Sequence, residues 1–298
     1  MKRALLLYDV TFWAYWRRAK ALQKYAPPDW TIDVALGYGN AMRKHDYDVI
    51  LQLYFSNVHG VRAMARKLDR RAKIVCGYNT GWKGAFPPRL ARAMPHSDLV
   101  ILNNRDLYDR IHAMSPKLKH ISNGVDLDEF RVTVPPAERQ FKIISQASLF
   151  HRVTKGYPDI LVPLEKELDK MGIAHDFRLV NSTKASTQLR GQALVDWYNS
   201  GTVYVVASKF EGTPNPALEA AACGCTVVAT PVGNMPELID GTNGVLVERK
   251  VAAFVAAIAE MRYTYIQWAA AMQTTIQGWH WRDRALEYFR LFDEVSRQ

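Results

Sequence analysis

The chain has few cysteines and no long apolar run, and each shortage excludes a class of protein. Its 298 residues include only three cysteines, Cys76, Cys223 and Cys225, all among apolar neighbours. This odd number predicts buried free thiols and not a disulfide framework. The apolar run at 4–7 is too short for a signal peptide, and no segment reaches the roughly 18 apolar residues of a membrane-spanning helix. The sequence therefore predicts a cytoplasmic protein.

Acidic residues are scarce in the first half of the chain. Residues 1–138 contain 22 Lys and Arg but 13 Asp and Glu, so nine of the ten formal net positive charges lie there. Residues 139–298 are nearly neutral. Such asymmetry predicts a negatively charged partner, either nucleic acid or an anionic membrane surface, although a basic face that is merely solvated has the same composition.

Internal repeats and low-complexity tracts are also absent, and the remaining pattern alternates short strand-like runs with helical ones. The strand-like runs lie at 4–8, 32–36, 49–53, 74–78 and 99–102, then at 141–145, 177–180, 203–207, 226–230 and 244–247. Amphipathic stretches such as 61–71 and 106–114 separate them. This βαβ rhythm predicts an α/β protein with two Rossmann-like domains, each a parallel sheet covered by helices. Residues 132–139 indicate a linker.

The most informative segment runs from Lys209 to Ala220, within a longer stretch from residue 203 to residue 224. Its strand-like start is followed by turn-forming residues and then by a helix, with Asn215 expected as N-cap, Pro216 at the first helical position and Gly224 just past the end. The free N–H groups of such a helix start favour phosphate. Glu211 and Glu219, on either side of the loop, can accept hydrogen bonds from the paired hydroxyls of ribose or a hexose. A plain helix cap with two surface glutamates is the alternative.

These residues resemble the donor site of retaining glycosyltransferase family 4, which has the GT-B fold. The matching positions are Glu211-x7-Glu219, Ala220, Gly224, residues 227–230 and Gly233-x3-Glu237, with Lys155-Gly156 and Asn123-Gly124-Val125-Asp126 and Phe130 upstream. The resemblance is close over 98–295 and weak before that. It implies two Rossmann-like domains with parallel sheets facing a central cleft. The first, at 1–134, would bind the acceptor, the second, at 135–278, would bind the nucleotide sugar, and a helix at 279–298 would cross back.

The resemblance also implies individual roles on the donor side. Glu219 would bind the ribose hydroxyls, while Glu211 would position the donor sugar. Backbone groups of Gly212, Thr213, Pro214 and Asn215 would contact hexose and phosphate.

Two cations would stabilise charge on the diphosphate leaving group, as preorganised positive groups do. They are Lys155 and Arg152, which follow the first strand of the second domain. The family usually has an arginine six or seven residues before the lysine, where this chain has Ser148 and Leu149. Arg152 would therefore act from a shifted position.

No metal or other cofactor is expected beside the co-substrate, for which a UDP-sugar is the leading candidate. Two Asp-x-Asp pairs, at 46–48 and 126–128, suggest the metal-dependent class of glycosyltransferase. The first abuts a strand and the second belongs to the interdomain segment, so we predict that neither binds a metal.

The first domain departs from the family pattern, because it lacks both the glycine-rich loop after its first strand and the usual later histidine. Asp9, at the end of that strand, is a candidate to orient or deprotonate the acceptor, or else a helix N-cap. Aromatic residues interleaved with cations suit an acceptor with flat groups and phosphates, or an anionic lipid surface. The predicted acceptor-binding residues are Trp13, Arg17, Arg18, Asn79, Trp82 and Lys83. A buried helix stripe is the alternative for Trp13.

The sequence thus predicts a retaining, metal-independent hexosyltransferase. Its acceptor is either a hydroxymethylated base in DNA or an envelope polysaccharide or lipid-linked glycan, which would place the protein on DNA or at the membrane periphery. A catalytically degenerate subunit that only binds a sugar nucleotide is the third hypothesis.

Overall fold

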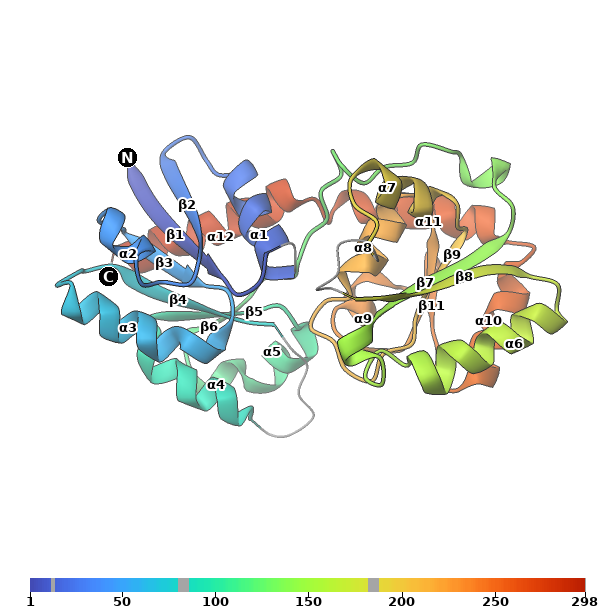
Figure 1. Ribbon diagram of the computed structural model, residues 1–298, viewed down its shortest axis with the longest axis horizontal. Coiled ribbons are helices and arrows are strands. Elements are labelled where there is room, and N and C mark those ends of the chain that lie inside the picture. Colours follow the sequence, from blue (N-terminus) through green and yellow to red (C-terminus); the bar gives the residue numbers. More distant parts are fainter. Residues whose placement is uncertain (12–13, 80–85, 182–187, 298) are drawn as a thin grey trace. The chain divides into compact units, whose positions relative to one another are not determined.

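Figure 1 shows the computed structural model, which describes residues 1–11, 14–79, 86–181 and 188–297. The chain divides into two compact units. The first comprises Met1–Asn123 together with Trp281–Gln298, and the second comprises Gly124–His280. Each unit is a parallel β-sheet with helices packed against both faces, as the βαβ rhythm predicts.

The first unit contains a six-stranded sheet in the order β2-β1-β3-β4-β5-β6. Its strands are β1 Lys2–Tyr8, β2 Trp30–Leu36, β3 Val49–Gln52, β4 Lys73–Tyr78, β5 Leu99–Leu102 and β6 Leu118–His120, and every neighbouring pair is parallel. The five predicted strands all form. The sixth, β6, was missed because its three residues include two polar ones.

Both faces of this sheet are buried because side chains alternate along each strand. On β1, Ala4 and Leu6 face a core shared with helices α1 (Ala14–Lys24) and α12 (Trp281–Ser296). Leu5 and Leu7 face the opposite core. Helices α3 (Val58–Lys67), α4 (Pro88–Ala93) and α5 (Arg105–Ile111) cover that side, and the short α2 (Ala41–Lys44) follows β2.

The second unit contains a five-stranded parallel sheet in the order β11-β10-β9-β7-β8. Its strands are β7 Lys142–Ser148, β8 Ala174–Val180, β9 Val203–Val206, β10 Thr226–Ala229 and β11 Gly244–Leu246. One face packs against α7 (Gln192–Asn199), α8 (Asn215–Ala222), α9 (Met235–Leu238) and α11 (Tyr265–Gln277). The other packs against α6 (Val162–Lys170) and α10 (Val251–Met261). A single π-helical turn, Tyr157–Leu161, leads into α6.

The boundary between the units lies at Asn123 and Gly124, earlier than the predicted break after residue 134. The intervening segment is bound to the second unit by backbone and side chain. The Val125 N–H donates to the Trp279 carbonyl at 2.8 Å, the Thr133 N–H donates to Asn199 Oδ1 at 2.8 Å, and Phe130 packs in the core of that unit. The prolines at 135 and 136 indicated a linker at that point. The apolar residues that hold the chain against the second unit, Val125 and Phe130, lie before these prolines.

The strand order of each unit determines where a ligand can bind. In the first sheet β1 lies between β2 and β3, and in the second β7 lies between β8 and β9. The connection after β1 or β7 therefore runs to one side of the sheet, and the next connection crosses back to the other side. The loops at the carboxyl ends of β1 and β3 thus diverge, and so do those of β7 and β9. In open α/β sheets such a switch point opens a crevice that binds ligands.

The prediction of buried free thiols agrees with the structure. Cys76, Cys223 and Cys225 are buried and free, and burial raises the pKa of Cys76 and Cys225 to about 12. Within the part of the chain that the structure describes, no helix combines the length and apolarity needed to cross a bilayer.

Candidate donor site

A pocket opens at the switch point of the second sheet. It is bounded by the ends of β7 and β9 and by the loops that follow them. The residues that line it are Ser145, Gln146, Lys155, Tyr204, Val205, Val206, Ala207, Ser208, Glu211, Pro214 and Pro216. Three of the predicted site residues, Lys155, Glu211 and Pro214, are among them.

Lys155 and Glu211 form an ion pair inside this pocket. The two residues lie on different loops, one after β7 and the other after β9. The Ser208 hydroxyl donates to the same oxygen of Glu211, Oε1, at 2.7 Å. The Glu211 side chain is 10% exposed and that of Lys155 is 26% exposed. The pair is therefore largely shielded from water but still reachable by a ligand.

The two loops are held together through their backbones. The Lys209 N–H donates to the Thr154 carbonyl at 2.8 Å. Gly156 has φ +77°, and a Cβ at this position would lie 2.3 Å from the Ala207 carbonyl oxygen. Only glycine allows this close approach, which explains the Lys155-Gly156 pair in the sequence.

Gly233 supports the Glu211 loop from the other side. Its φ is +60°, and a Cβ there would lie 2.5 Å from the Gly212 carbonyl oxygen and 3.0 Å from the Glu211 Cβ. In addition, the Thr230 hydroxyl donates to the Ser208 carbonyl at 2.8 Å. The loop after β10 thereby fixes the position of the Glu211 backbone beside the pocket.

Helix α8 begins one residue earlier than predicted. Asn215 is its first residue, Pro216 its second, and Pro214 occupies the N-cap position. The Pro214 ring fixes φ near the helical value, so the helix can begin directly after it. The predicted C-terminus is confirmed. Gly224 has φ +93°, and the Gly224 and Cys225 N–H groups donate to the Ala221 and Ala220 carbonyls, each at 3.0 Å, as in a Schellman motif.

Glu219 lies in α8, is 7% exposed and is not among the residues that line the pocket. The hydroxyl of Tyr198, a fully buried residue of α7, donates to Glu219 Oε2 at 2.7 Å. Sequence analysis identified the carboxylate but missed the tyrosine, whose only signal was its position on an apolar helix face. The tyrosine fixes one oxygen and thereby orients the other.

Arg152 does not line the pocket. Its side chain is exposed, and Nη1 lies 3.4 Å from the Leu149 carbonyl oxygen. The structure therefore brings Lys155 and Glu211 together but leaves Arg152 outside their contact. A role for Arg152 in stabilising the leaving group stays a prediction.

In the first unit, Asp9 lies at the corresponding switch point, directly after β1. The Val10 N–H donates to Asp9 Oδ1 at 2.7 Å. Burial raises the pKa of the Asp9 carboxyl. Tyr54, which follows β3, also has a raised pKa, first because of burial and then because of the negative charge of Asp9. A carboxylate and a phenol thus lie close enough to interact electrostatically at the switch point of this sheet.

Arg18 is buried, whereas a residue that binds the acceptor is expected to be exposed. It is 3% exposed and donates hydrogen bonds to Asn79 Oδ1 and Asn123 Oδ1. The amphipathic turn of α1 points this guanidinium into the unit, where it links α1 with the ends of β4 and of the segment after β6. Arg18 and Asn79 were both predicted to bind the acceptor, and the structure shows them in contact with each other.

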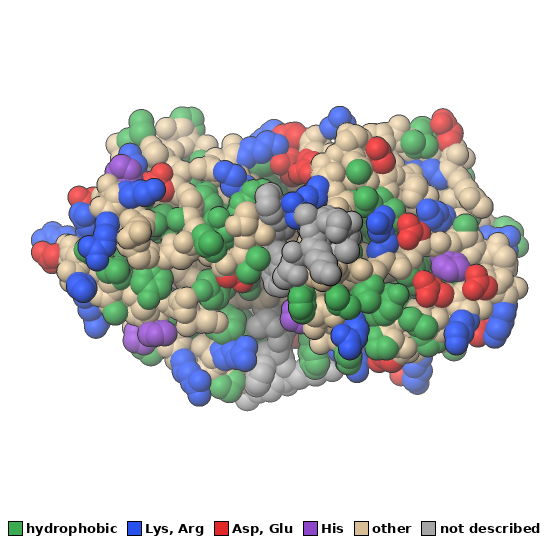
Figure 2. All heavy atoms as spheres, in the orientation of Figure 1, with side chains coloured by type: hydrophobic (Ala, Val, Ile, Leu, Met, Phe, Trp, Pro, Cys, Tyr) green, Lys and Arg blue, Asp and Glu red, His purple; other side chains and the backbone are tan. Residues whose placement is uncertain are grey.

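The other residues predicted to bind the acceptor lie partly outside the described part of the chain. Trp13, Trp82 and Lys83 lie outside the described residues, and Arg17 is half-buried. On the face drawn in Figure 2, the Lys and Arg side chains of the first unit, on the left, are scattered and do not form one patch. The excess of positive charge on this unit is therefore not concentrated on that face.

Two family models match the chain. The model described as Glycosyltransferase Family 4 matches residues 6–129, and the model described as Glycosyl transferases group 1 matches residues 155–262. A D-inositol 3-phosphate glycosyltransferase of Xylanimonas cellulosilytica is 33% identical over 184 residues, which are 51% of this chain and 42% of that relative. One from Arthrobacter sp. is 38% identical over 97 residues, 31% of this chain and 23% of the relative. The aligned segments thus span less than half of these relatives.

Solved structures share the fold over almost the entire chain. Sucrose-phosphate synthase from Thermosynechococcus elongatus superimposes with a TM-score of 0.74 at 16% identity, covering 99% of both chains. HepE of Anabaena, solved in complex with UDP, superimposes with a TM-score of 0.72 at 14% identity, covering 99% of this chain and 100% of that one. The predicted GT-B fold is thereby confirmed.

Proposed function

Because the chain belongs to glycosyltransferase family 4, we propose that it transfers a hexose from a nucleoside-diphosphate sugar to a hydroxyl acceptor, with retention of configuration. The observation that carries this proposal is the meeting of Lys155 and Glu211 in one pocket at the switch point of the second sheet. A cation for the diphosphate and a carboxylate for the sugar lie there beside the start of a helix. A UDP-sugar is the proposed donor, since solved HepE is in complex with UDP.

In this proposal each site residue contacts a different part of the donor. Lys155 and the first turn of α8 meet the diphosphate, where negative charge grows as the bond to the sugar breaks. Glu211 accepts hydrogen bonds from hexose hydroxyls, and Glu219, oriented by Tyr198, accepts them from the ribose. Glu211 is a positioning group in this scheme, and the acceptor proton passes to the donor phosphate.

We propose that no metal ion takes part in the transfer step. Lys155 and the positive end of the α8 dipole supply the positive potential that a metal supplies in other transferases. Turnover in excess EDTA tests this directly. Unchanged turnover is expected, and complete loss that manganese restores would contradict the proposal.

For the acceptor we propose a small phosphorylated polyol in preference to DNA. The curated relatives are named for D-inositol 3-phosphate. Arg18 is internal, and the cations on the face drawn in Figure 2 are dispersed, so the first unit lacks the gathered charge that a duplex would need there. In this proposal Asp9, which lies directly after β1, meets an acceptor hydroxyl.

The test combines a donor screen with an acceptor screen. The protein is incubated with a panel of nucleotide sugars, first alone to measure hydrolysis and then with inositol phosphate, a lipid-linked saccharide or hydroxymethylated DNA. Mass spectrometry of the products identifies the added hexose and its acceptor. Transfer only to DNA or to the lipid-linked saccharide would overturn the acceptor proposal. Binding of a nucleotide sugar without any turnover would indicate a sugar-nucleotide-binding subunit.

A further inference from the structure

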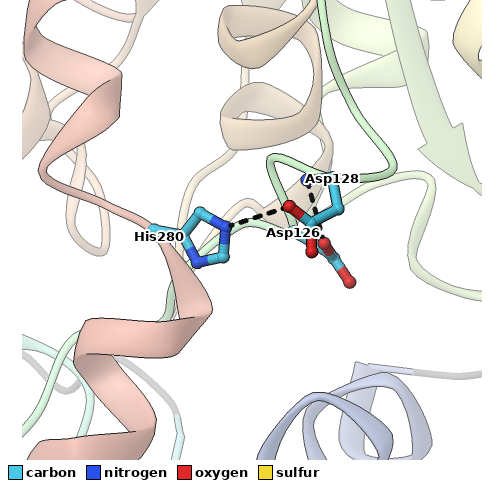
Figure 3. Close-up of side chains that lie close together, drawn as sticks. All are labelled: Asp126, Asp128 and His280. Atoms are coloured by element: carbon cyan, nitrogen blue, oxygen red, sulfur yellow. Dashed lines mark hydrogen bonds and ion pairs between the residues drawn. The ribbon is translucent and has the colours of Figure 1, made fainter. Parts of the chain in front are cut away.

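Three side chains that could bind a metal gather where the chain enters and leaves the second unit. Asp126 and Asp128 lie just after its first residue, Gly124, and His280 is its last residue. One ligand atom from each side chain lies within 4.8 Å of the other two. Figure 3 shows the His280 ring directed at the two carboxylates. A sequence separation of about 150 residues hid this group, and Asp126 and Asp128 were assigned to the interdomain segment and predicted to bind no metal.

The imidazole distinguishes this group from a common cluster of surface carboxylates. His280 is 9% exposed, and its Nε2 lies 3.8 Å from Asp128 Oδ1. That separation is longer than a direct hydrogen bond. Two ligands that are each about 2.1 Å from the same ion lie about 3 to 4 Å apart. The distance therefore suits two ligands of a shared ion.

The backbone holds these ligands in place. The Val125 N–H donates to the Trp279 carbonyl at 2.8 Å, and Val125 and His280 form a parallel β-bridge. The Asp128 N–H donates to Asp126 Oδ1 at 3.1 Å, which restrains that carboxylate. Of the three, Asp128 is the one with an exposed side chain, which leaves the group accessible to an ion from solvent. The backbone pairing thus keeps the three side chains together.

We propose that Asp126, Asp128 and His280 bind a divalent transition-metal ion, zinc or manganese. Two carboxylate oxygens and one imidazole nitrogen are a donor set that both metals accept, with water at the open positions. None of the three residues lines the donor pocket. The ion joins the segment after Gly124 to the segment before α12 and stabilises their pairing, and it takes no part in sugar transfer.

The experiment uses the full chain, stripped of metal with a chelator and then dialysed. Calorimetric titration with Zn²⁺ and with Mn²⁺ measures affinity and stoichiometry, and a melting curve measures the effect on stability. Asp128→Asn removes a ligand charge from an exposed, isosteric position and leaves the fold intact. Glu129→Gln is the matched control, because it neutralises the adjacent exposed carboxylate outside the group. His280→Gln gives a second test of the imidazole.

The expected result is one site for Zn²⁺ or Mn²⁺ that raises the melting temperature. Asp128→Asn should weaken it at least tenfold, while Glu129→Gln leaves it unchanged. Failure of the wild-type chain to bind either ion, or equal binding by wild type and Asp128→Asn, would overturn the proposal. UDP binding by Asp128→Asn is measured in parallel. Loss of the metal site with unchanged UDP binding separates this proposal from the glycosyltransferase proposal.

Discussion

Lys155 and Glu211 neutralise each other within the donor pocket, although each is assigned to a different part of the donor. The Ser208 hydroxyl donates to the same Glu211 oxygen that contacts Lys155. Their contact offsets part of the cost of burying the two side chains, and either one without its partner would be unfavourable in this place. We expect a donor that enters the pocket to replace this contact with one from Lys155 to phosphate and one from Glu211 to sugar.

Glu211→Gln should lower turnover without weakening the binding of UDP. The amide cannot hold the hexose as a carboxylate does, but its loss of charge frees Lys155 for phosphate. We expect UDP affinity to stay equal or to increase, measured by calorimetry, while the rate at saturating donor falls. A parallel loss of UDP affinity would show that Glu211 contacts the nucleotide.

Lys155→Ala should lower the rate at saturating donor by about 100-fold, since the charge that Lys155 meets is greatest in the transition state. Steady-state kinetics with the identified donor measure this. Arg152→Ala is the matched control, because Arg152 lies in the same connection after β7 but outside the pocket. An equal rate loss in both variants would assign Arg152 a share in the chemistry.

Glu219→Ala should weaken UDP binding by about 1.5–3 kcal/mol, because a charged acceptor of ribose hydrogen bonds is lost. That corresponds to roughly 10- to 150-fold in the dissociation constant. Tyr198→Phe keeps the carboxylate but removes the hydroxyl that orients it, so we expect a smaller loss, about 3- to 10-fold. Calorimetry with UDP measures both. Unchanged affinity in Glu219→Ala would exclude a ribose contact.

Gly156→Ala should destabilise the protein far more than Gly172→Ala does. Both glycines have positive φ, +77° and +62°, so both substitutions carry the backbone strain of about 1 kcal/mol. The added Cβ has open space at Gly172 but would lie 2.3 Å from the Ala207 carbonyl at Gly156. Chemical denaturation should show a loss of more than about 2 kcal/mol for Gly156→Ala. Equal losses of stability in the two variants would show that the loop at Gly156 rearranges around the added Cβ without a further loss of unfolding free energy.

Asp9→Asn should stabilise the protein at neutral pH and reduce transfer. The pKa of Asp9 is raised by burial, so the folded state retains this proton to a higher pH than the unfolded chain. The free energy of unfolding therefore falls as pH rises from about 4 through the raised pKa. The asparagine removes that penalty, and the melting temperature of the variant should exceed that of the wild type increasingly over this interval. An identical pH profile in both proteins would contradict the burial effect.

Much of the fold was predictable because its signals are local. Ten strands were predicted close to their observed positions, since buried parallel strands are continuous runs of β-branched and apolar residues. The element that was missed, β6, is too short to show a period. The start of α8 was displaced by one residue, because Pro214 and Pro216 each fit a helix start and sequence cannot choose between them.

The sequence by itself determined the two α/β units and the family, because glycines, prolines and carboxylates at fixed spacings encode the donor loop. Only the tertiary structure decided which groups touch. It paired Lys155 with Glu211 and Tyr198 with Glu219, turned Arg18 inward and brought His280 to Asp126 and Asp128. These contacts depend on strand order and on the face that each helix buries. Both are set by packing between segments far apart in the chain, which local spacing does not record.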